Sequence, residues 1–455
     1  MNKKDYMDKM HSILQDDTKF NEIGIPKANL IFKLEDKINR NLKRWKDNNI
    51  INKSTYEELY CSGSSFGTLY GLPKVHKPNA PLRPILAAYN LPNFHIAKFL
   101  VPMLEKLTTN QYTLSNSYSF VPEVITQNAQ LVMVSFDVKS LFTNVPLVET
   151  INIILNKLFT QDNETVSGFD RSTFKDLLEL AVLDTNFIFD NKLYHQIDGM
   201  AMGSPLGPTF ANIFMCHLEE GIFSECPDEI KPKLYKRYID DTFAIFETFE
   251  QADRFLNFIN SRHPNIEFTI ETEQENSLSF LDICISRTNN TFSTGVYRKN
   301  TFTGLGLNFY SFCPLNFKIN SCKTLLHRAY NICSDWNKFH MEVSFLIEYF
   351  GKNCYPPAVF YGVLRKFLNN IFSPPMQHCT VPKKKVYVSL PYMGNLTTSI
   401  KKDLTSHLTR LYPYVQFHFI FKNNFTLGNL FKFKDGIPKL FRSGIIINLI
   451  VLDVI

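Results

Sequence analysis

The stretch Tyr238-Ile239-Asp240-Asp241 places two carboxylates side by side between two segments with the pattern of β-strands. Leu234-Tyr235-Lys236-Arg237 precedes it, and the apolar, aromatic-rich segment Thr242-Phe243-Ala244-Ile245-Phe246 follows it. The sequence therefore predicts a β-hairpin with Asp240 and Asp241 at its tip. A solvated Asp-Asp turn is common, but neighbouring carboxylates repel each other unless a cation lies between them. A metal site is the alternative interpretation.

A third carboxylate, Asp137, ends the apolar run Leu131-Val132-Met133-Val134-Ser135-Phe136, which has the composition of a buried strand. Carboxylate oxygens are ligands that Mg²⁺ prefers, and two such ions can bind the attacking and leaving oxygens of a phosphoryl displacement. The three acids together favour metal-dependent nucleotidyl transfer. A long stretch of chain separates Asp137 from the hairpin, so the spacing alone does not establish that the acids meet.

Five segments occur in the order of the sequence motifs of reverse transcriptases, and in detail the chain resembles the Penelope-like retroelement family. The resemblance extends over residues 1–370, and its first and last segments point to this family in particular. The segments are Gly71–Pro78 with Leu82–Ile85, Phe136–Pro146, Asp198–Pro208, the hairpin Tyr238–Asp241, and Leu278–Asp282.

Alternating strand and helix patterns around a central hairpin predict an α+β fold, and the resemblance implies a right-hand polymerase with fingers, palm and thumb. A helical subdomain follows the palm. The expected divisions are an N-terminal helical extension (1–62), fingers and palm (63–300), a helical thumb with a helix-turn-helix (301–372), and a truncated connector (373–455).

The resemblance also implies roles for individual residues. It makes Asp137, Asp240 and Asp241 catalytic, and it places two Mg²⁺ ions, for which Mn²⁺ can substitute, on these acids and the Val138 carbonyl. The residues implied to bind the incoming nucleotide are Lys74, Arg83, Phe142, Met202 and Gly203, and those implied to contact primer or template are Tyr238 and Ser204.

Phe142 carries the expectation about sugar choice, because the family places this side chain beneath the 2′ carbon, where a large ring leaves no room for a hydroxyl. The alternative is an ordinary core aromatic in a chain with 41 Phe. Met202 departs from the glutamine that many retroviral-type enzymes carry there. His76 and Lys77 lie near the nucleotide-binding positions and are weaker candidates for the same role.

Apolar periodicity predicts the remaining elements. Leu34, Ile38, Leu42 and Trp45 indicate a helix whose other face is basic, which suits either a solvated surface or a phosphate backbone. Further helices are expected at 147–158, 172–184, 210–220, 249–262, 319–334, 338–350 and 356–371, and strands at 187–189, 193–197, 266–270, 278–285 and 294–298.

Composition limits the class of protein. With 455 residues, 44% of them hydrophobic, the chain can fill a packed core. Its net charge of +6 suits nucleic acid without requiring it. Nine cysteines without a Cys-x-x-Cys pair indicate reduced thiols. No signal peptide opens the sequence, and the longest apolar run, Ile445–Val451, is too short to span a bilayer. We expect an intracellular, nuclear protein without membrane contact.

The leading hypothesis is an RNA-directed DNA polymerase that takes an RNA template, a DNA primer and deoxynucleoside triphosphates. The alternatives are an RNA-dependent RNA polymerase and an inactive or domesticated copy that only binds nucleic acid. The oligomeric state is not set by the sequence. Many relatives end in a GIY-YIG endonuclease. We expect a truncated copy without it, because Pro391-Tyr392-Met393-Gly394 has no Gly-Ile-Tyr strand before it. Met1–Tyr6 resembles an internal start.

Overall fold

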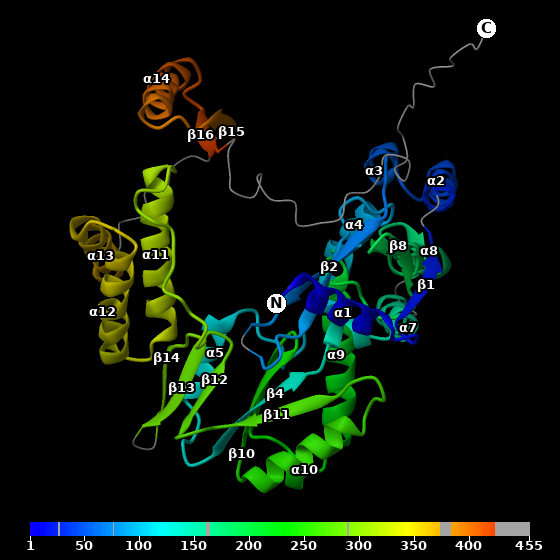
Figure 1. Cartoon of the computed structure of the whole chain (residues 1–455), viewed down its shortest axis with the longest axis horizontal. Helices are drawn as coiled ribbons and strands as arrows, with labels where there is room; N and C mark the ends of the chain where they lie inside the picture. Colours follow the sequence, from blue (N-terminus) through cyan, green and yellow to red (C-terminus); the bar gives the residue numbers. More distant parts are fainter. Residues whose placement is uncertain (26–27, 76, 161–163, 289–290, 374–383, 424–455) are drawn as a thin grey trace. The chain divides into compact units, whose positions relative to one another are not determined.

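The computed structural model describes residues 1–25, 28–75, 77–160, 164–288, 291–373 and 384–423 (Figure 1). Contacts divide these residues into two compact units. The first unit contains Met1–Asn116 and Gln130–Phe280, and the second contains Ser117–Ala129 and the described residues from Leu281 onward. These two units differ from the four-part division expected from the sequence, which stays a prediction.

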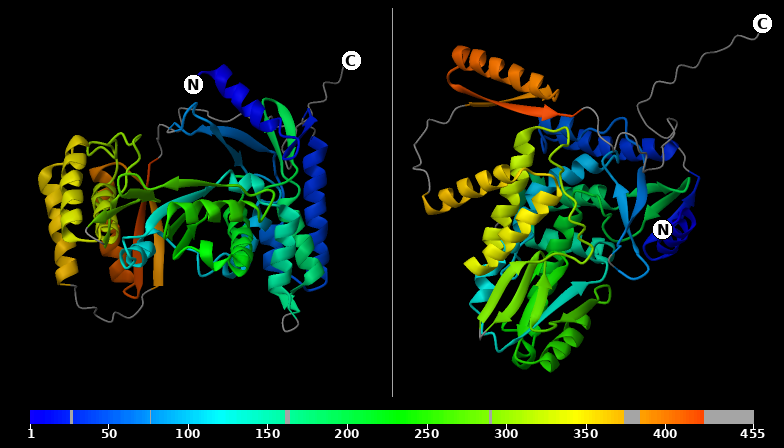
Figure 2. Two further views of the ribbon diagram at one scale, coloured as in Figure 1. Left: turned by 90° about the horizontal axis from the view of Figure 1, so that it is seen from below. Right: turned by 60° about the vertical axis from the view of Figure 1, so that its left-hand side comes forward.

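One sheet of the first unit has five strands in the order β1-β8-β7-β2-β3. The strands predicted at 187–189 and 193–197 are confirmed as the hairpin β7–β8, and its turn residues Asp190 and Asn191 both have positive φ, as a type I′ turn requires. Helix α1 (Lys3–Leu14) packs against β2 and β3 (Figure 2). The strands are β1 Phe20–Gly24, β2 Gly67–Pro73, β3 Leu82–Ala87, β7 Asn186–Phe189 and β8 Lys192–Gln196.

A second, antiparallel sheet of four strands has the order β11-β4-β10-β9 and carries the predicted acidic hairpin. Helix α10 (Phe249–Asn260) packs against it, and Phe255 meets Phe136 and Phe246 from the sheet in an aromatic cluster. The strands are β4 Val132–Val138, β9 Leu234–Tyr238, β10 Asp241–Phe246 and β11 Phe268–Thr272.

Helices surround these sheets in the first unit. Helix α9 (Gly207–Glu225) contains the helix predicted at 210–220; it begins with Pro208 in its first turn and is buried along much of its length. The predicted helices at 147–158 and 172–184 are α7 and α8. The other elements are α2 Ala28–Asp47, α3 Lys53–Leu59, α4 Phe94–Leu104, α6 Leu141–Asn144, α7 Leu147–Leu158, α8 Arg171–Val182, the 3-10 turns Glu105–Leu107 and Asp228–Ile230, and the short strands β5 Thr165–Val166 and β6 Phe169–Asp170.

The basic helix predicted around Leu34–Trp45 is α2. Two of its cations are paired, because Lys37 binds Asp184 at 2.6 Å and Arg44 binds Asp176 at 3.0 Å. Part of the basic face therefore holds α2 against α8 and the residues that follow it.

The single strand predicted at 278–285 is wrong. The structure has β12 (Ser277–Phe280) and β13 (Ile283–Thr288) there, and Leu281 between them has a φ of +56°. A left-handed residue cannot continue an extended strand. The boundary between the two units falls at this break.

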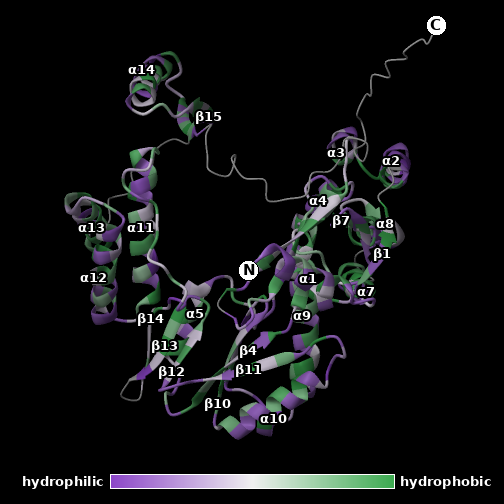
Figure 3. Cartoon of the chain, viewed as in Figure 1, coloured by the Kyte–Doolittle hydropathy of each residue, from purple (hydrophilic) through white to green (hydrophobic). Residues whose placement is uncertain are grey.

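The second unit contains the three helices predicted after the palm: α11 (Leu315–Ile332), α12 (Trp336–Lys352) and α13 (Pro357–Phe372). Arg328 on α11 binds Asp282 at 2.9 Å, which ties the hairpin of β13 and β14 (Thr291–Val296) to the helices. Helix α5 (Ser117–Ile125) also packs against α11 and β14. The helices alternate purple and green in Figure 3, as amphipathic helices do.

Past the three helices, β15 (Lys384–Pro391) and β16 (Val415–Lys422) form a parallel pair connected by α14 (Asn395–Leu411). The expected connector lies partly outside the described residues. Of the helices that the structure describes, none is long and apolar enough to cross a bilayer. The cysteines among the described residues are free thiols. Burial raises the pKa of Cys61 and of Cys333 to about 12.

Candidate active site

The acidic hairpin closes through a strained two-residue turn. Tyr238 and Asp241 are paired across β9 and β10, so Ile239 and Asp240 form the turn itself. Ile239 has a φ of +58°, whereas Asp240 does not have a positive φ, which is the pattern of a type II′ turn. A β-branched residue in this region costs about 1–3 kcal/mol and persists only where its surroundings hold it.

The side chain of Arg237 supports this turn by a hydrogen bond. Its side chain is fully buried, and its Nη1 donates to the Ile239 carbonyl at 3.1 Å. Its Nε and Nη2 donate to the two carboxylate oxygens of Glu219 on α9, at 2.6 and 3.1 Å. The bidentate pair fixes the guanidinium, and the guanidinium in turn fixes the turn carbonyl.

Further hydrogen bonds complete the surroundings of this pair. Arg237 Nη1 also donates to Asn212 at 2.9 Å, and Asn110 donates to Glu219 at 2.8 Å. The backbone of Arg237 accepts from the Leu114 N–H at 2.8 Å. This network was not predicted from the sequence. The available signal was a pair of opposite charges, Glu219 in the helix predicted at 210–220 and Arg237 in the strand segment that leads into the acidic hairpin.

The structure brings Asp137 to the same end of the sheet as the hairpin tip. Strand β4 pairs with β10 so that Asp137 lies directly opposite Asp241. The Val138 N–H donates to the Asp240 carbonyl at 3.3 Å. Asp137 therefore lies beside the acidic hairpin, as the resemblance implied.

Acidic and basic side chains lie close enough at this end of the sheet to shift each other's pKa. The pKa of Asp137 is raised, first by burial and then by the charge of Asp240, while Lys77, Lys74 and Arg83 oppose the rise. The pKa of Lys74 is lowered by burial and by Arg83 and Lys77. Lys77, a weaker candidate on sequence grounds, thus acts on Asp137 together with Lys74 and Arg83.

The donor set fits a hard cation. Asp137 and Asp240 are close enough to repel each other, and a divalent ion between them would remove this repulsion. Over the described residues, no group of three or more His, Cys, Asp or Glu side chains is arranged to hold a metal. The pair would therefore need further oxygen ligands, such as a nucleotide's phosphates, to complete a shell.

Phe142 lies on α6 next to the loop that follows β8. Its carbonyl accepts from the Met200 N–H at 2.6 Å, and an added Cβ at Gly207 would lie 3.6 Å from its ring. Gly199 has a φ of +78°, and a Cβ there would lie 2.4 Å from the Thr143 carbonyl oxygen. The ring of Phe142 is half-buried and packs against the core of the first unit.

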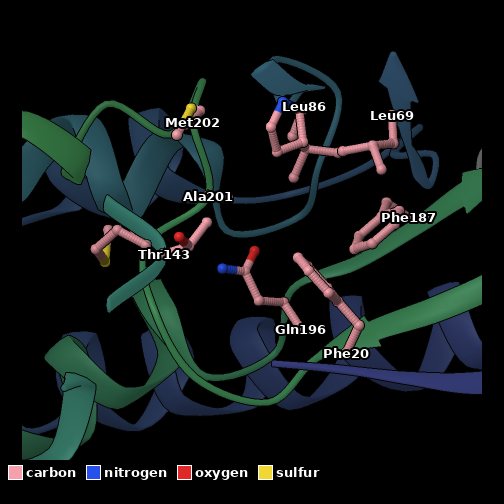
Figure 4. A pocket seen from close by; sticks show the side chains of 10 residues that line it. Phe20, Leu69, Leu86, Thr143, Phe187, Gln196, Ala201 and Met202 are labelled. Carbon is pink, nitrogen blue, oxygen red and sulfur yellow. The ribbon is translucent and has the colours of Figure 1, made fainter. Parts of the chain in front are cut away.

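Gly203 approaches the backbone of β3. Its φ is +129°, and a Cβ would lie 2.0 Å from the Leu86 carbonyl oxygen, while the Leu86 N–H donates to the Met202 carbonyl at 2.8 Å. Figure 4 shows Met202 and Leu86 beside a cavity that Gln196 also lines. The cavity holds only about 10 Å³, the space of one water, so it is no nucleotide site. Ser204 continues the turn, with its N–H donating to Ala201 at 3.0 Å.

Comparison with known proteins identifies the family. A profile described as "Reverse transcriptase (RNA-dependent DNA polymerase)" matches residues 75–307, slightly more than half of the chain. The chain belongs to the reverse transcriptase family. The match contains the acidic hairpin and Asp137, and it begins one residue after Lys74. The predicted α+β, right-hand polymerase fold is confirmed. A second profile, "Animal helix-turn-helix domain", matches residues 305–361, from before α11 to the first turns of α13.

Solved structures that resemble this reverse transcriptase chain include telomerase and viral polymerases. Telomerase from Candida albicans, in complex with a TWJ fragment of telomeric RNA, is 12% identical with a TM-score of 0.46, covering 70% of this chain and 58% of that chain. The Sicinivirus 3Dpol RNA-dependent RNA polymerase is 12% identical with a TM-score of 0.45, covering 70% of this chain and 71% of that chain. The alignments with telomerases span less than two thirds of their length. No match was found among curated proteins.

Replacing Arg237 with Met should leave the Glu219 charge buried without its partner and destabilise the first unit by about 3–5 kcal/mol. Denaturant unfolding of the variant measures this loss. The control is Lys236→Met on the same strand, whose half-exposed side chain should cost much less. If adding Glu219→Leu to Arg237→Met does not recover part of the stability, the buried pair is not the cause.

Replacing Gly203 with Ala should destabilise the protein by about 1–3 kcal/mol or more, because the new Cβ meets the Leu86 carbonyl at an unfavourable φ. Gly221→Ala is the matched control. Gly221 lies inside α9 with nothing within 4 Å of an added Cβ, so that change should stabilise by up to about 1 kcal/mol. Equal melting temperatures for the two variants would contradict the assigned contact.

Proposed function

We propose that this chain is an RNA-directed DNA polymerase that extends a DNA primer on an RNA template. The observation that carries the proposal is the coupling of Asp137 and Asp240 at one end of a sheet, facing the cations Lys74, Lys77 and Arg83. Nucleotidyl transfer requires carboxylates that can bind divalent metal ions, and it requires basic side chains nearby that can bind a triphosphate. Membership of the reverse transcriptase family supports the same activity.

Each group has a defined role in this proposal. Two Mg²⁺ ions, or Mn²⁺ in their place, would activate the primer 3′-hydroxyl and stabilise the leaving pyrophosphate. Asp137 and Asp240 would hold them, with Asp241 and the Val138 carbonyl in supporting positions. Lys74, Lys77 and Arg83 bind and orient the triphosphate and stabilise the charge that develops on it.

The loop around Gly203 and the hairpin face the nucleic acid in this proposal. Met202, Gly203 and Ser204 approach the nucleotide and its template base through their backbone, since the turn presents little side-chain bulk. Tyr238 packs near the primer terminus. Phe142 lies beside this loop and excludes a 2′-hydroxyl, which favours deoxynucleotides over ribonucleotides.

We further propose that the chain comes from a Penelope-like retroelement and acts in the nucleus. A helix-turn-helix match that begins where the polymerase match ends supports this subtype, because the resemblance places such a segment there. An RNA-dependent RNA polymerase is the alternative among enzymes, and a nucleic-acid-binding copy without activity is the alternative outside them.

Replacing Asp240 with Asn should reduce primer extension by orders of magnitude while fold and nucleic-acid binding are kept, because the change removes a ligand charge but little volume. The assay is extension of a DNA primer annealed to RNA, with Mg²⁺ and four deoxynucleotides. Asp253→Asn on the exposed face of α10 is the control and should keep full activity. Near wild-type extension by Asp240→Asn would show that the site is assigned wrongly. Binding without any extension by the unmodified chain would select the inactive copy.

Replacing Phe142 with Ala should increase ribonucleotide incorporation relative to deoxynucleotide incorporation, because the ring no longer fills the space under the sugar. Competition between the two nucleotide classes in single-nucleotide extension measures the ratio. Phe258→Ala is a matched control, since Phe258 is a half-buried aromatic of α10 away from the acids. An unchanged ratio in Phe142→Ala would make Phe142 a core residue without a role in selectivity.

A further inference from the structure

Helix α1 packs on the same strands that carry the nucleotide-facing cations. Met10 and Leu14 are buried in one apolar cluster with Leu69 of β2 and Leu82 of β3. Figures 1 and 2 show α1 beside these two strands. The connection after β2 bears Lys74 and Lys77, and β3 bears Arg83. The helix is therefore placed to influence the cations, a role that was not predicted from the sequence.

Helix α1 contacts β2 closely at Gly71. The Gly71 N–H donates to the Tyr6 hydroxyl at 2.8 Å. Strand β2 pairs with β7 only at Gly67 and Thr68, so Tyr6 supplies a partner to a strand N–H beyond that pairing. An added Cβ at Gly71 would lie 2.6 Å from the Met10 sulfur. The glycine at this position of the first motif thus makes room for α1.

The connection between β2 and β3 holds a conformation that needs support. Asn79 and Ala80 both have positive φ, +59° and +41°, which side chains other than glycine rarely adopt. The Lys74 N–H donates to the Pro81 carbonyl at 2.9 Å, and the Ala80 N–H donates to the Lys77 carbonyl at 3.1 Å. Any relaxation at Asn79 and Ala80 therefore moves Lys74 and Lys77.

Lys9 of α1 supplies this support. Its ammonium donates to the carbonyl of Asn79 and, at 3.3 Å, to the carbonyl of Ala80. A charged donor to two neighbouring carbonyls is stronger than a neutral hydrogen bond. Both strained residues are thus restrained by one side chain from another part of the sequence.

We propose that Lys9 is a positioning residue for the nucleoside triphosphate, which it serves by bracing the connection that carries Lys74 and Lys77. The identity of the substrate rests on the proposed polymerase function. The mechanism rests on the hydrogen bonds from Lys9 to the carbonyls of Asn79 and Ala80. Lys9 acts through the backbone of Asn79 and Ala80. Losing the brace should weaken triphosphate binding more than the chemical step or the grip on primer and template.

The first test is steady-state extension by Lys9→Met, with Lys4→Met on the exposed face of α1 as the matched control. The KM for deoxynucleotide should rise about tenfold, as expected for the loss of about 1.4 kcal/mol, while kcat and the Kd for primer and template change less than about twofold. Lys9→Arg should restore most of the KM. An unchanged KM, or equal losses in KM, kcat and Kd, would overturn the proposal.

The second test does not need activity. Hydrogen exchange at the amides of Gly71, Lys74 and Ala80 should be faster in Lys9→Met than in Lys4→Met, with melting temperatures alike. Tyr6→Phe should speed exchange at Gly71 most. Identical exchange in both lysine variants would overturn the brace. If the two variants differ in this way but the unmodified protein extends no primer, the proposed function is overturned and the brace stands.

Discussion

The buried ion pair between Arg237 and Glu219 is the interaction on which the geometry of the acidic hairpin depends. It joins α9 to β9 and delivers one further donor to the carbonyl of Ile239. Burying two charges is costly unless the geometry is good and the remaining donors are satisfied. Both conditions hold here, since Asn212 and Asn110 take up remaining hydrogen-bonding capacity. The pair thus fixes the turn in which Asp240 lies.

The site combines a strained turn with carboxylates that repel each other, and neither feature stabilises the fold. In the proposed function both would be useful, because the ligands of a divalent cation would already be placed and little reorganisation would be needed. Stability comes from elsewhere in the first unit, from the aromatic cluster of Phe136, Phe246 and Phe255 and from the buried length of α9. Strain at a functional site is offset by packing at a distance.

Glycines mark the places where separate segments meet through their backbones. Gly203 brings the loop after β8 onto β3, Gly199 brings the same loop onto α6, and Gly71 admits Met10 of α1. These close contacts link three parts of the first unit: the cations on the β2–β3 connection, the loop beside Phe142 and the acids of the second sheet. The arrangement of the proposed nucleotide site is therefore a property of the packing of all these parts.

The sequence by itself determined the elements with local signals. Periodicity and turn chemistry, which act over a few residues, predict the bounds of α7, the strands on both sides of Asp190-Asn191, the acidic hairpin and the three helices after the palm. The prediction of both acids at the hairpin tip is wrong by one residue, because Asp241 is already the first residue of β10 and pairs with Tyr238. Only the tertiary structure decided that Glu219 pairs with Arg237, that the charge of Lys77 acts on Asp137, that Lys9 holds Asn79 and Ala80, and that a left-handed Leu281 breaks the strand. Three of these are interactions between residues that are not neighbours in the chain, and no local pattern records which distant partner a side chain meets. The break at Leu281 was hidden because its flanks both have strand composition.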